Sequence, residues 1–214
     1  MSDVLTRFAP AERWVHRATG LLMGVCLLTA FALYYGPVSL AVGHRHAVEL
    51  VHVWAGYALA APLLLGLLSA AYRADLGALN RFSREDWRWL RSKNRRDGSF
   101  EVGKFNAGQK LNAALTAGSI VVLLGTGTLM FWTGLARLAW RTGATFVHDW
   151  FALGLGLLVL GHIWFAISDP EAREGMKTGM VRRSWAQKEH PEWVRSEDGR
   201  GGSSGTARGP ATRR

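Results

Sequence analysis

The sequence is poor in the residues that build several common kinds of site. It has one cysteine in 214 residues, Cys26, which excludes an intrachain disulfide and a cysteine-rich metal site. Acidic residues are nearly absent from its long apolar segments, where Asp149 is the only one. A transporter is expected to carry buried acids along its substrate path, so this scarcity argues against a transporter.

The apolar residues are concentrated in four segments, residues 18–36, 51–72, 111–132 and 147–168. Each is close to the roughly 20 residues that an α-helix needs to cross about 30 Å of hydrocarbon. The first segment follows a polar stretch and shows no small-residue cleavage signal, so we expect a retained helix rather than a signal peptide. The sequence therefore predicts an all-α integral membrane protein, folded as a bundle of four transmembrane helices.

The basic residues predict how this bundle is oriented. Lysine and arginine number 3 before the first segment, 10 between the second and third and 10 after the fourth, which places 23 on one side of the membrane. The other side holds 3. By the positive-inside rule, both termini and the long middle loop face the cytoplasm. The net charge of +10 thus reflects topology, and a nucleic-acid partner is not expected.

Short helices are expected outside the membrane segments. Between the second and third segments, Ser83 and Asp86 have the spacing of a capping box, and the Trp and Arg residues that follow favour a helix at the membrane interface. After the fourth segment, Asp169, Pro170 and Glu171 form a helix start. We assign residues 1–195 to the membrane domain and residues 196–214, dominated by Gly, Ser, Arg and Thr, to a disordered basic tail.

Four of the seven histidines lie within or next to the membrane segments. With the N-terminus inside, His16 and His162 lie at the inner level, whereas His52 and His148 lie at the outer level. His148 and His162 are 14 residues apart, which is four turns at about 3.5 residues per turn. Both rings therefore leave one face of the same helix, separated by about 21 Å in depth.

Two histidine pairs at two depths are what two bis-histidine haems stacked across a membrane require, because imidazole binds iron through one ring nitrogen. Gly20 and Gly56 follow proposed ligands by one turn and would leave room for a macrocycle, although small residues also serve ordinary helix packing. Any one of the four histidines could simply be interfacial, and two separate metal sites are an alternative. His44, His46 and His190 lie outside the membrane segments, and we expect them to be solvated or to face a partner.

A second candidate site precedes the third segment, at the inner level. Residues 104–110 read Lys-Phe-Asn-Ala-Gly-Gln-Lys, in which Asn106, Gly108 and Gln109 bring amides and a small residue together. A quinone needs hydrogen-bond donors at its carbonyl oxygens, an apolar slot for its tail and a proton route to water. The alternative is a helix start in which Asn106 is the N-cap and the lysines mark the membrane boundary.

From about residue 8 to residue 193, the chain resembles the gamma, or cytochrome b556, subunit of membrane-bound formate dehydrogenase. Residues 106–110 and the segment after residue 168 are the more specific parts of this resemblance. The motifs that carry it are Arg13-Trp14-Val15-His16, His52-Val53-Trp54-Ala55-Gly56, Lys104-Phe105-Asn106-Ala107-Gly108-Gln109-Lys110, His148-Asp149-Trp150, Gly161-His162-Ile163-Trp164 and Asp169-Pro170-Glu171, followed by Gly175, Met176, Thr178, Gly179, Val181, Trp185 and Ala186.

The resemblance implies two b haems, with the inner haem held by the inner histidine pair and the outer haem by the outer pair. This agrees with the pairing reached from topology. It also implies a site for a quinone, menaquinone or ubiquinone, beside the inner haem, in which Asn106, Gly108 and Gln109 contact the quinone and His162 lies next to its ring.

The implied function is that of a multi-pass respiratory cytochrome b in the bacterial inner membrane. Electrons would pass from an iron–sulfur beta subunit through the two haems to quinone at the cytoplasmic side. Formate would be oxidised at a molybdenum or tungsten site in the alpha subunit, and this chain would carry no formate-oxidising site. The alternatives are a di-haem cytochrome b of a hydrogenase or another respiratory reductase, and a haem-free structural membrane anchor.

Overall fold

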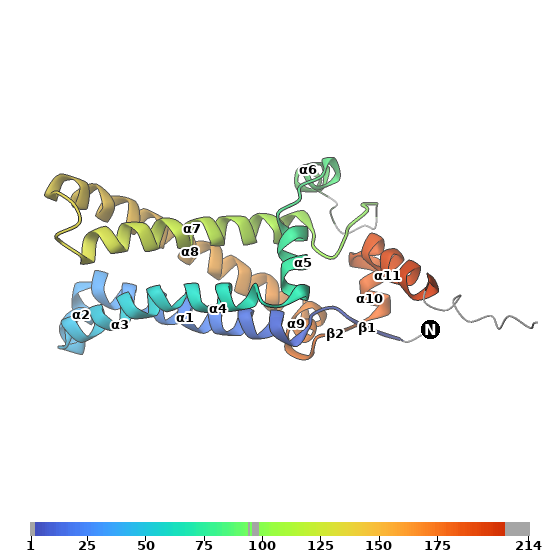
Figure 1. Ribbon diagram of the computed structural model, residues 1–214, viewed down its shortest axis with the longest axis horizontal. Coiled ribbons are helices and arrows are strands. Elements are labelled where there is room, and N and C mark those ends of the chain that lie inside the picture. Colours follow the sequence, from blue (N-terminus) through green and yellow to red (C-terminus); the bar gives the residue numbers. More distant parts are fainter. Residues whose placement is uncertain (1–2, 94, 96–98, 204–214) are drawn as a thin grey trace, which may run out of the picture.

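The computed structural model describes residues 3–93, 95 and 99–203, and within them the chain is almost entirely helical (Figure 1). Its elements in chain order are β1 (Val4–Thr6), α1 (Pro10–Tyr34), α2 (Gly36–Val42), α3 (Arg45–Ala58), α4 (Ala60–Gly66), α5 (Ala70–Leu79), α6 (Arg84–Arg91), α7 (Ala107–Phe131), α8 (Leu138–Ser168), α9 (Pro170–Thr178), β2 (Met180–Arg182), α10 (Arg183–Glu189) and α11 (Pro191–Ser203).

Four helical stretches of the described residues are long and apolar enough to cross a membrane, namely α1, α3 with α4, α7 and α8. They run along the long axis of the molecule (Figure 1). This confirms the predicted bundle of four transmembrane helices. The helical pattern between α3 and α4 is interrupted only at Leu59, whose backbone stays helical, because Pro62 cannot donate a hydrogen bond to the Ala58 carbonyl.

The second membrane helix ends earlier than the sequence predicts. It stops at Gly66 rather than at residue 72, and the chain then turns into α5. Ser69 is the N-cap of α5, since its hydroxyl oxygen accepts a hydrogen bond from the Tyr72 amide at 3.3 Å. The apolar run therefore continues across a helix boundary, which hydrophobicity alone does not reveal.

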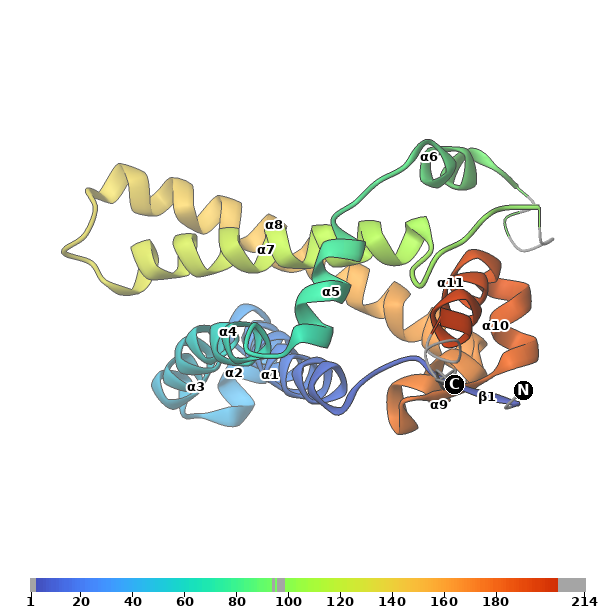
Figure 2. The same ribbon diagram turned by 45° about the vertical axis from the view of Figure 1, so that its right-hand side comes forward.

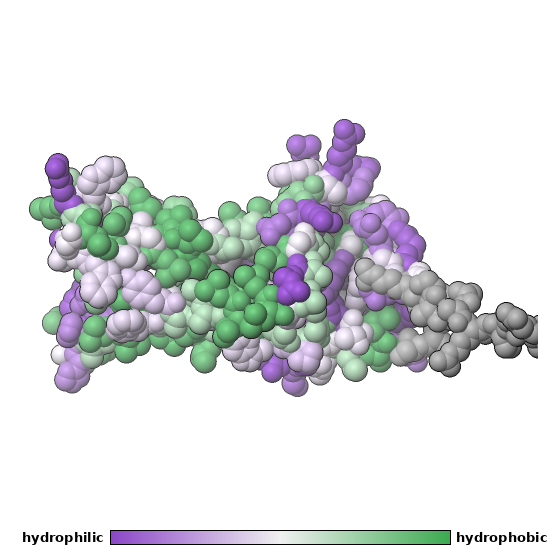
Figure 3. Space-filling model, in the orientation of Figure 1, coloured by the Kyte–Doolittle hydropathy of each residue, from purple (hydrophilic) through white to green (hydrophobic). Residues whose placement is uncertain are grey.

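The outer faces of the four spans carry large apolar side chains. Leu21 and Leu28 on α1 are each 72% exposed, and Leu157 on α8 is 62% exposed. Figure 3 shows apolar surface over the middle of the bundle, with hydrophilic residues gathered towards its two ends. Such a surface suits contact with lipid tails, because burying it in a bilayer removes it from water.

The core of the bundle lies where α1, α3, α7 and α8 meet. Its buried residues are Met23, Cys26, Ala55, Leu59, Ile120 and Leu155. Leu155 is only 2% exposed and is seven residues from both His148 and His162 on α8. The tight centre of the bundle therefore lies midway between the two histidine levels.

The two ends of the bundle differ. At one end, which we call the far end, are α2 and the loop between α7 and α8 (Figures 1 and 2). At the other, the capped end, α5 crosses from α4 towards α7, and α9, α10 and α11 gather near the N-terminal segment. There β1 and β2 form an antiparallel ribbon that pairs Leu5 with Val181, a contact that the sequence did not predict.

The predicted short helices are present at the capped end. In α6, the Ser83 hydroxyl accepts from the Asp86 amide at 3.2 Å, and the Asp86 carboxylate accepts from the Ser83 amide at 2.7 Å, which confirms the capping box. In α9, the Asp169 carboxylate accepts from the Ala172 amide at 3.0 Å and Pro170 is the first helical residue.

The last described helix reaches further than we expected. Helix α11 continues to Ser203, into the stretch from residue 196 that we assigned to a disordered tail. Pro191 and Glu192 occupy its first turn, where they favour helix formation, and buried Trp193 and Val194 anchor it against β2 and α10. Residues 204–214 of the expected tail lie outside the described residues.

Candidate functional site

The structure brings the four membrane histidines together as two facing pairs. His16 on α1 lies against His162 on α8, with ring centroids 6.0 Å apart. His52 on α3 lies against His148 on α8, with ring centroids 6.2 Å apart. These are the pairs expected from topology. Because α8 is one continuous helix, the two pairs are separated by about 21 Å along it.

These separations suit axial ligation of a single metal ion by each pair. A metal–nitrogen bond of about 2.0 Å on either side, with the size of the imidazole ring added, puts the two ring centroids about 6.3 Å apart. Both observed distances agree with this value to within a few tenths of an ångström. The spacing of each pair therefore suits two imidazoles that hold one iron between them.

Hydrogen bonding selects the coordinating nitrogen of His52. The Thr29 hydroxyl donates to the Val25 carbonyl at 2.7 Å, so its oxygen acts as an acceptor towards His52 Nδ1, 2.9 Å away. The Cys26 carbonyl is a second acceptor, at 3.1 Å from the same nitrogen. His52 therefore carries its proton on Nδ1, which leaves Nε2 unprotonated and available to a metal ion.

His148 has the same arrangement with the neighbouring helix. The Thr126 hydroxyl on α7 donates to the Val122 carbonyl at 2.7 Å, and its oxygen lies 2.9 Å from His148 Nδ1. Both histidines of the far pair thus use a threonine to fix the tautomer in which Nε2 is unprotonated. Neither threonine was singled out from the sequence, because the acceptor becomes evident only when the helices are packed.

The space around the far pair suits a large apolar group. His52 and His148 both line a largely apolar pocket, together with Gly56 and apolar side chains of α1, α7 and α8. A Cβ atom added at Gly56 would meet nothing within 4 Å, so the helix leaves room one turn after His52. The same is true of Gly20, one turn after His16 of the other pair. One at Gly127 would lie 3.3 Å from the His148 ring, so this glycine allows the imidazole to approach α7.

The donor set also suits haem. Among the described residues, no three His, Cys, Asp or Glu side chains converge on a point where they could hold a metal ion. Each level thus offers two imidazoles, and the four nitrogens of a porphyrin would complete the six ligands of iron. The residues present therefore fit two haem groups, held by His52 with His148 and by His16 with His162.

The amide residues proposed as quinone contacts start α7 at the capped end. Asn106 is the N-cap, since its side-chain oxygen accepts from the Gln109 amide at 2.9 Å. The Gln109 side-chain oxygen in turn accepts from the Asn106 amide at 3.0 Å. The capping alternative is therefore observed. It uses both side-chain oxygens and leaves the two NH₂ groups as donors, so capping and contact with a quinone are compatible.

Gly108 has a structural reason to be a glycine. A Cβ atom there would lie 3.3 Å from the Trp89 ring and 3.3 Å from Asn106 Oδ1. Trp89 on α6 therefore packs directly over the first turn of α7. A direct role for Gly108 in ligand binding is not needed to explain its presence.

A buried arginine ties the segment before α7 to both ends of the chain. The Arg7 guanidinium donates to the Lys104 carbonyl and to His190 Nε2, each at 2.9 Å, and its carbon lies 4.8 Å from the centre of the Trp185 ring. Burial lowers the pKa of Arg7 to about 10, so it remains a cation at neutral pH. Arg7 thereby holds the backbone that leads into Asn106.

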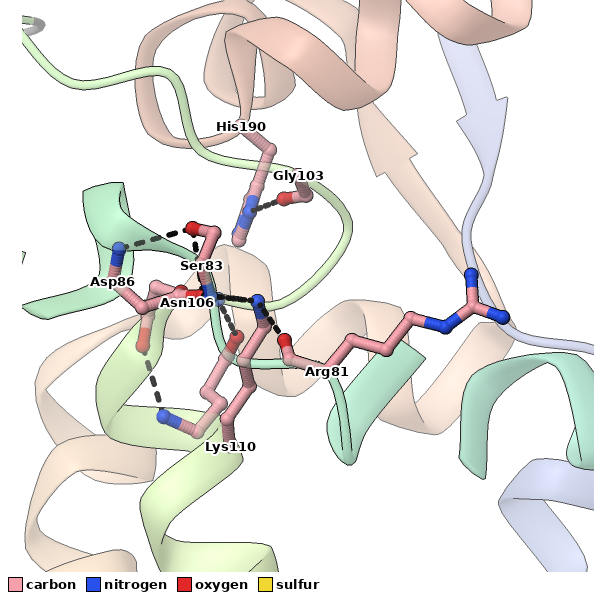
Figure 4. A network of polar contacts seen from close by, with 8 residues as sticks. Arg81, Ser83, Asp86, Gly103, Asn106, Lys110 and His190 are labelled. Atoms are coloured by element: carbon pink, nitrogen blue, oxygen red, sulfur yellow. Dashed lines mark hydrogen bonds and ion pairs between the residues drawn. The ribbon is translucent and has the colours of Figure 1, made fainter. Parts of the chain in front are cut away.

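His190 was expected to be solvated or to face a partner, and its burial contradicts this expectation. The side chain is only 2% exposed. Because Arg7 donates to Nε2, the proton of the neutral ring lies on Nδ1, which donates to the Gly103 carbonyl at 2.7 Å (Figure 4). In contrast, His44 and His46 are exposed near the start of α3, as expected.

A buried ion pair fixes α6 against α7 beside Asn106 (Figure 4). Lys110 Nζ lies 2.8 Å from Asp86 Oδ2 and also donates to the Arg81 carbonyl at 3.0 Å. Burial alone would raise the pKa of Asp86, but hydrogen bonds from Lys110 and Ser83 hold it below its usual value. This pair packs α6, which carries Trp89, against the start of α7.

The fold and the facing histidines define a helical membrane cytochrome. The sequence profile of the prokaryotic cytochrome b561 family matches residues 7–181, and the chain belongs to this family. It is therefore a multi-pass membrane protein that binds haem b.

Curated relatives are cytochrome subunits of formate dehydrogenases, which confirms the resemblance drawn from the motifs. The chain is 34% identical over 100 residues to the cytochrome b556(Fdn) subunit of the nitrate-inducible formate dehydrogenase of Escherichia coli K12, covering 44% of this chain and 45% of that protein. This match thus spans less than half of that relative. The cytochrome b556(fdo) subunit of the same strain is 23% identical over 203 residues, covering 90% and 93%. The cytochrome b556 subunit of Haemophilus influenzae formate dehydrogenase is 29% identical over 122 residues, covering 53% and 51%.

Proposed function

We propose that this chain is the cytochrome b subunit of a respiratory formate dehydrogenase, which carries electrons across the inner membrane through two b haems and delivers them to a quinone. The observation that supports this most strongly is the presence of two facing histidine pairs at two depths, with ring centroids 6.0 Å and 6.2 Å apart. Helix α8 contributes one histidine to each pair. A haem-free structural anchor would have no use for two such pairs, since stranding imidazoles in lipid is costly.

The chain's own residues have distinct tasks in this proposal. His52 and His148 hold iron at the far end, and His16 and His162 hold iron at the capped end. Each bound haem supplies a reversible one-electron couple between Fe(III) and Fe(II). Thr29 and Thr126 keep the far ligands in the coordinating tautomer, and the lipid-facing apolar side chains keep water from both sites.

The distribution of charge supports an orientation for this transfer. Of the 26 lysine and arginine residues, 23 precede the first span, lie between the second and third spans or follow the fourth, so both termini face the cytoplasm by the positive-inside rule. The far histidine pair then lies towards the outside, where an iron–sulfur subunit would dock. The iron–sulfur subunit would in turn bind the subunit that oxidises formate.

The names of the relatives favour formate dehydrogenase over a hydrogenase or another reductase as the parent complex. We therefore expect the chain to purify from its native membrane together with an iron–sulfur subunit. We also expect formate to reduce the haem of this purified complex. Recovery with a hydrogenase and with hydrogen-dependent reduction instead would move the chain to the rival complex.

The start of α7 is the proposed quinone contact. Asn106 and Gln109 present two side-chain NH₂ groups, which are the donors that the carbonyl oxygens of a quinone need. His162 lies at the same end of the bundle, as the C-terminal half of α8 and the start of α7 share it (Figure 1). A quinone here would receive its electrons from the haem of the capped end.

Two conservative variants separate quinone contact from capping. Asn106→Asp and Gln109→Glu keep the oxygen that each cap requires but remove the NH₂ donors. We expect both proteins to keep the helix content, thermal midpoint and haem content of the parent. Reoxidation of the dithionite-reduced haem by a short-chain menaquinone analogue, followed by stopped-flow absorbance, should become about tenfold slower or more, in line with the loss of hydrogen bonds worth about 1.5 kcal/mol.

Equal reoxidation rates in the parent and both variants would reduce these residues to a helix cap. A parent whose haem is not reoxidised by any quinone analogue would exclude quinone reduction by this chain. Lys93→Ala, an exposed residue outside α6 and α7, serves as a surface control that should leave the rate unchanged.

A further inference from the structure

Three ionisable side chains meet near the start of α7, and none of them belongs to the histidine pairs or to the proposed quinone contact. Lys104 Nζ lies 2.5 Å and 2.7 Å from the two carboxylate oxygens of Asp75 on α5, and 3.2 Å from Glu12 Oε1 on α1. The side chains of Glu12, Asp75 and Lys104 are 7%, 11% and 20% exposed. We call this group the acid–lysine cluster.

The cluster holds two acids and only one base. The Glu12 and Asp75 carboxyl groups both lie within 3.2 Å of the same Lys104 Nζ, so two negative charges compete for one positive partner, which favours protonation of one acid. Burial raises the pKa of Asp75 to about 7, against the opposing effect of Lys104. The cluster therefore binds and releases a proton close to neutral pH.

Other charged groups around Asp75 are already engaged. Arg7, which precedes α1, lies close enough to Asp75 for their charges to interact, but it is held by His190 and the Lys104 carbonyl. On the α7 side, Lys110 is paired with Asp86 of α6. Lys104 and Glu12 are therefore the groups that respond directly when Asp75 changes its protonation.

The position of the cluster connects water with the proposed quinone site. Glu12 precedes His16 by four residues, so the two side chains lie on one face of α1, one turn apart. Lys104 is two residues before Asn106. Helix α5, which carries Asp75, crosses the capped end between α1 and α7 (Figures 1 and 2). Lys104 is the most exposed member of the cluster.

We infer that Asp75 and Glu12, bridged by Lys104, form a proton relay that takes protons from water at the capped end and passes them towards the quinone. The inference rests on the proposed quinone function. Reduction of one quinone to quinol would take up two electrons, both delivered in turn through the haem of the capped end, and two protons. Both protons come from bulk water through Asp75 and Glu12, and the acids are reprotonated from water after each transfer.

The test uses the full chain with its haem in mild detergent. Asp75→Asn removes the titrating carboxyl but keeps its size, Asp75→Glu restores it, and Asp86→Asn is the matched control for the infrared measurement because Asp86 is an equally buried acid paired with a lysine at the same end. Two properties are measured as pH is varied from acid to alkaline: the infrared band of protonated carboxyl groups, and the rate at which a menaquinone analogue reoxidises reduced haem.

The parent should lose a protonated-carboxyl band near neutral pH, and Asp75→Asn should lack this change whereas Asp86→Asn keeps it. Asp75→Asn should also slow reoxidation about tenfold or more and flatten its pH profile, because a positioned proton donor contributes at least that much. Asp75→Glu should recover most of the rate. The haem spectrum and haem content should be unchanged in all of them.

A parent-like infrared titration or a parent-like pH profile in Asp75→Asn would overturn the relay while leaving the quinone proposal standing. If the parent itself is not reoxidised by quinone, the proposed function and the relay fail together. Should Asp75→Asn not fold, Glu12→Gln, which still accepts the hydrogen bond from the Ala9 amide, replaces it and must show the same slow, pH-independent rate.

Discussion

The hydroxyl of Thr126 offers a direct test of how the far haem is held. Thr126→Val keeps the shape of the side chain and removes the oxygen 2.9 Å from His148 Nδ1. Loss of a hydrogen-bond partner that orients a metal ligand weakens metal binding by about 10- to 100-fold. Thr126→Ser keeps the acceptor and serves as the control.

The same change should shift the reduction potential of that haem. An acceptor on Nδ1–H strengthens the imidazole as an electron donor to iron and so favours Fe(III). If the hydrogen bond is stronger in the oxidised state by about 1 kcal/mol, its loss raises the potential by about 40 mV, since about 59 mV corresponds to a tenfold change for one electron. Optical redox titration of the purified protein measures this shift. Equal haem retention and equal potentials in Thr126→Val and the parent would refute the assignment of His148 Nε2 as a ligand fixed by Thr126.

Three further predictions concern the scaffold. Asp86→Asn should lower the free energy of unfolding by about 1–3 kcal/mol at pH 7. Because the pKa of Asp86 is held below its usual value, the ionised pair stabilises the fold above the usual carboxyl range, and this contribution is lost as pH falls through the folded pKa. The thermal midpoints of variant and parent should therefore converge in acid, and a constant gap would contradict this. Gly179→Ala should loosen the capped end by about 1–3 kcal/mol, because φ is +92° and a Cβ would lie 2.5 Å from the Phe8 carbonyl oxygen; trypsin should then release the C-terminal segment faster, and parent-like resistance would count against the strain. In a Cys26→Ser background, a membrane-impermeant maleimide added to intact cells should label Gly134→Cys but not Arg173→Cys, and the reverse pattern would invert the proposed orientation.

The sequence was most informative where a single helix carries the signal. The four spans follow from runs of apolar residues, and the histidine pairs follow from depth, because a helix of fixed rise converts residue number into position across the membrane. The cap residues Ser83 and Asp169 were predictable for the same reason, since each acts within its own first turn. The pattern also placed Asn106 at a helix start, and the structure shows that it is the cap.

What could not be predicted depends on contacts between distant segments. Lys104 meets Asp75 across 29 residues and Glu12 across 92, and no local pattern indicates that three separate elements converge there. His190 looked like a solvated tail residue, but its burial depends on Arg7, 183 residues away. Thr29 and Thr126 resemble ordinary helix threonines until the packing of neighbouring helices places them against histidine rings.

A pyridine haemochrome count can establish whether two histidine pairs hold two haems at two depths. It is made on the purified chain, on His148→Ala and His162→Ala, and on exposed His44→Ala as the control. We expect two b haems per chain in the parent and in His44→Ala, and one lost or disturbed haem in each of the other two variants. A colourless parent after expression with adequate haem, or two undisturbed haems in both variants, would contradict it.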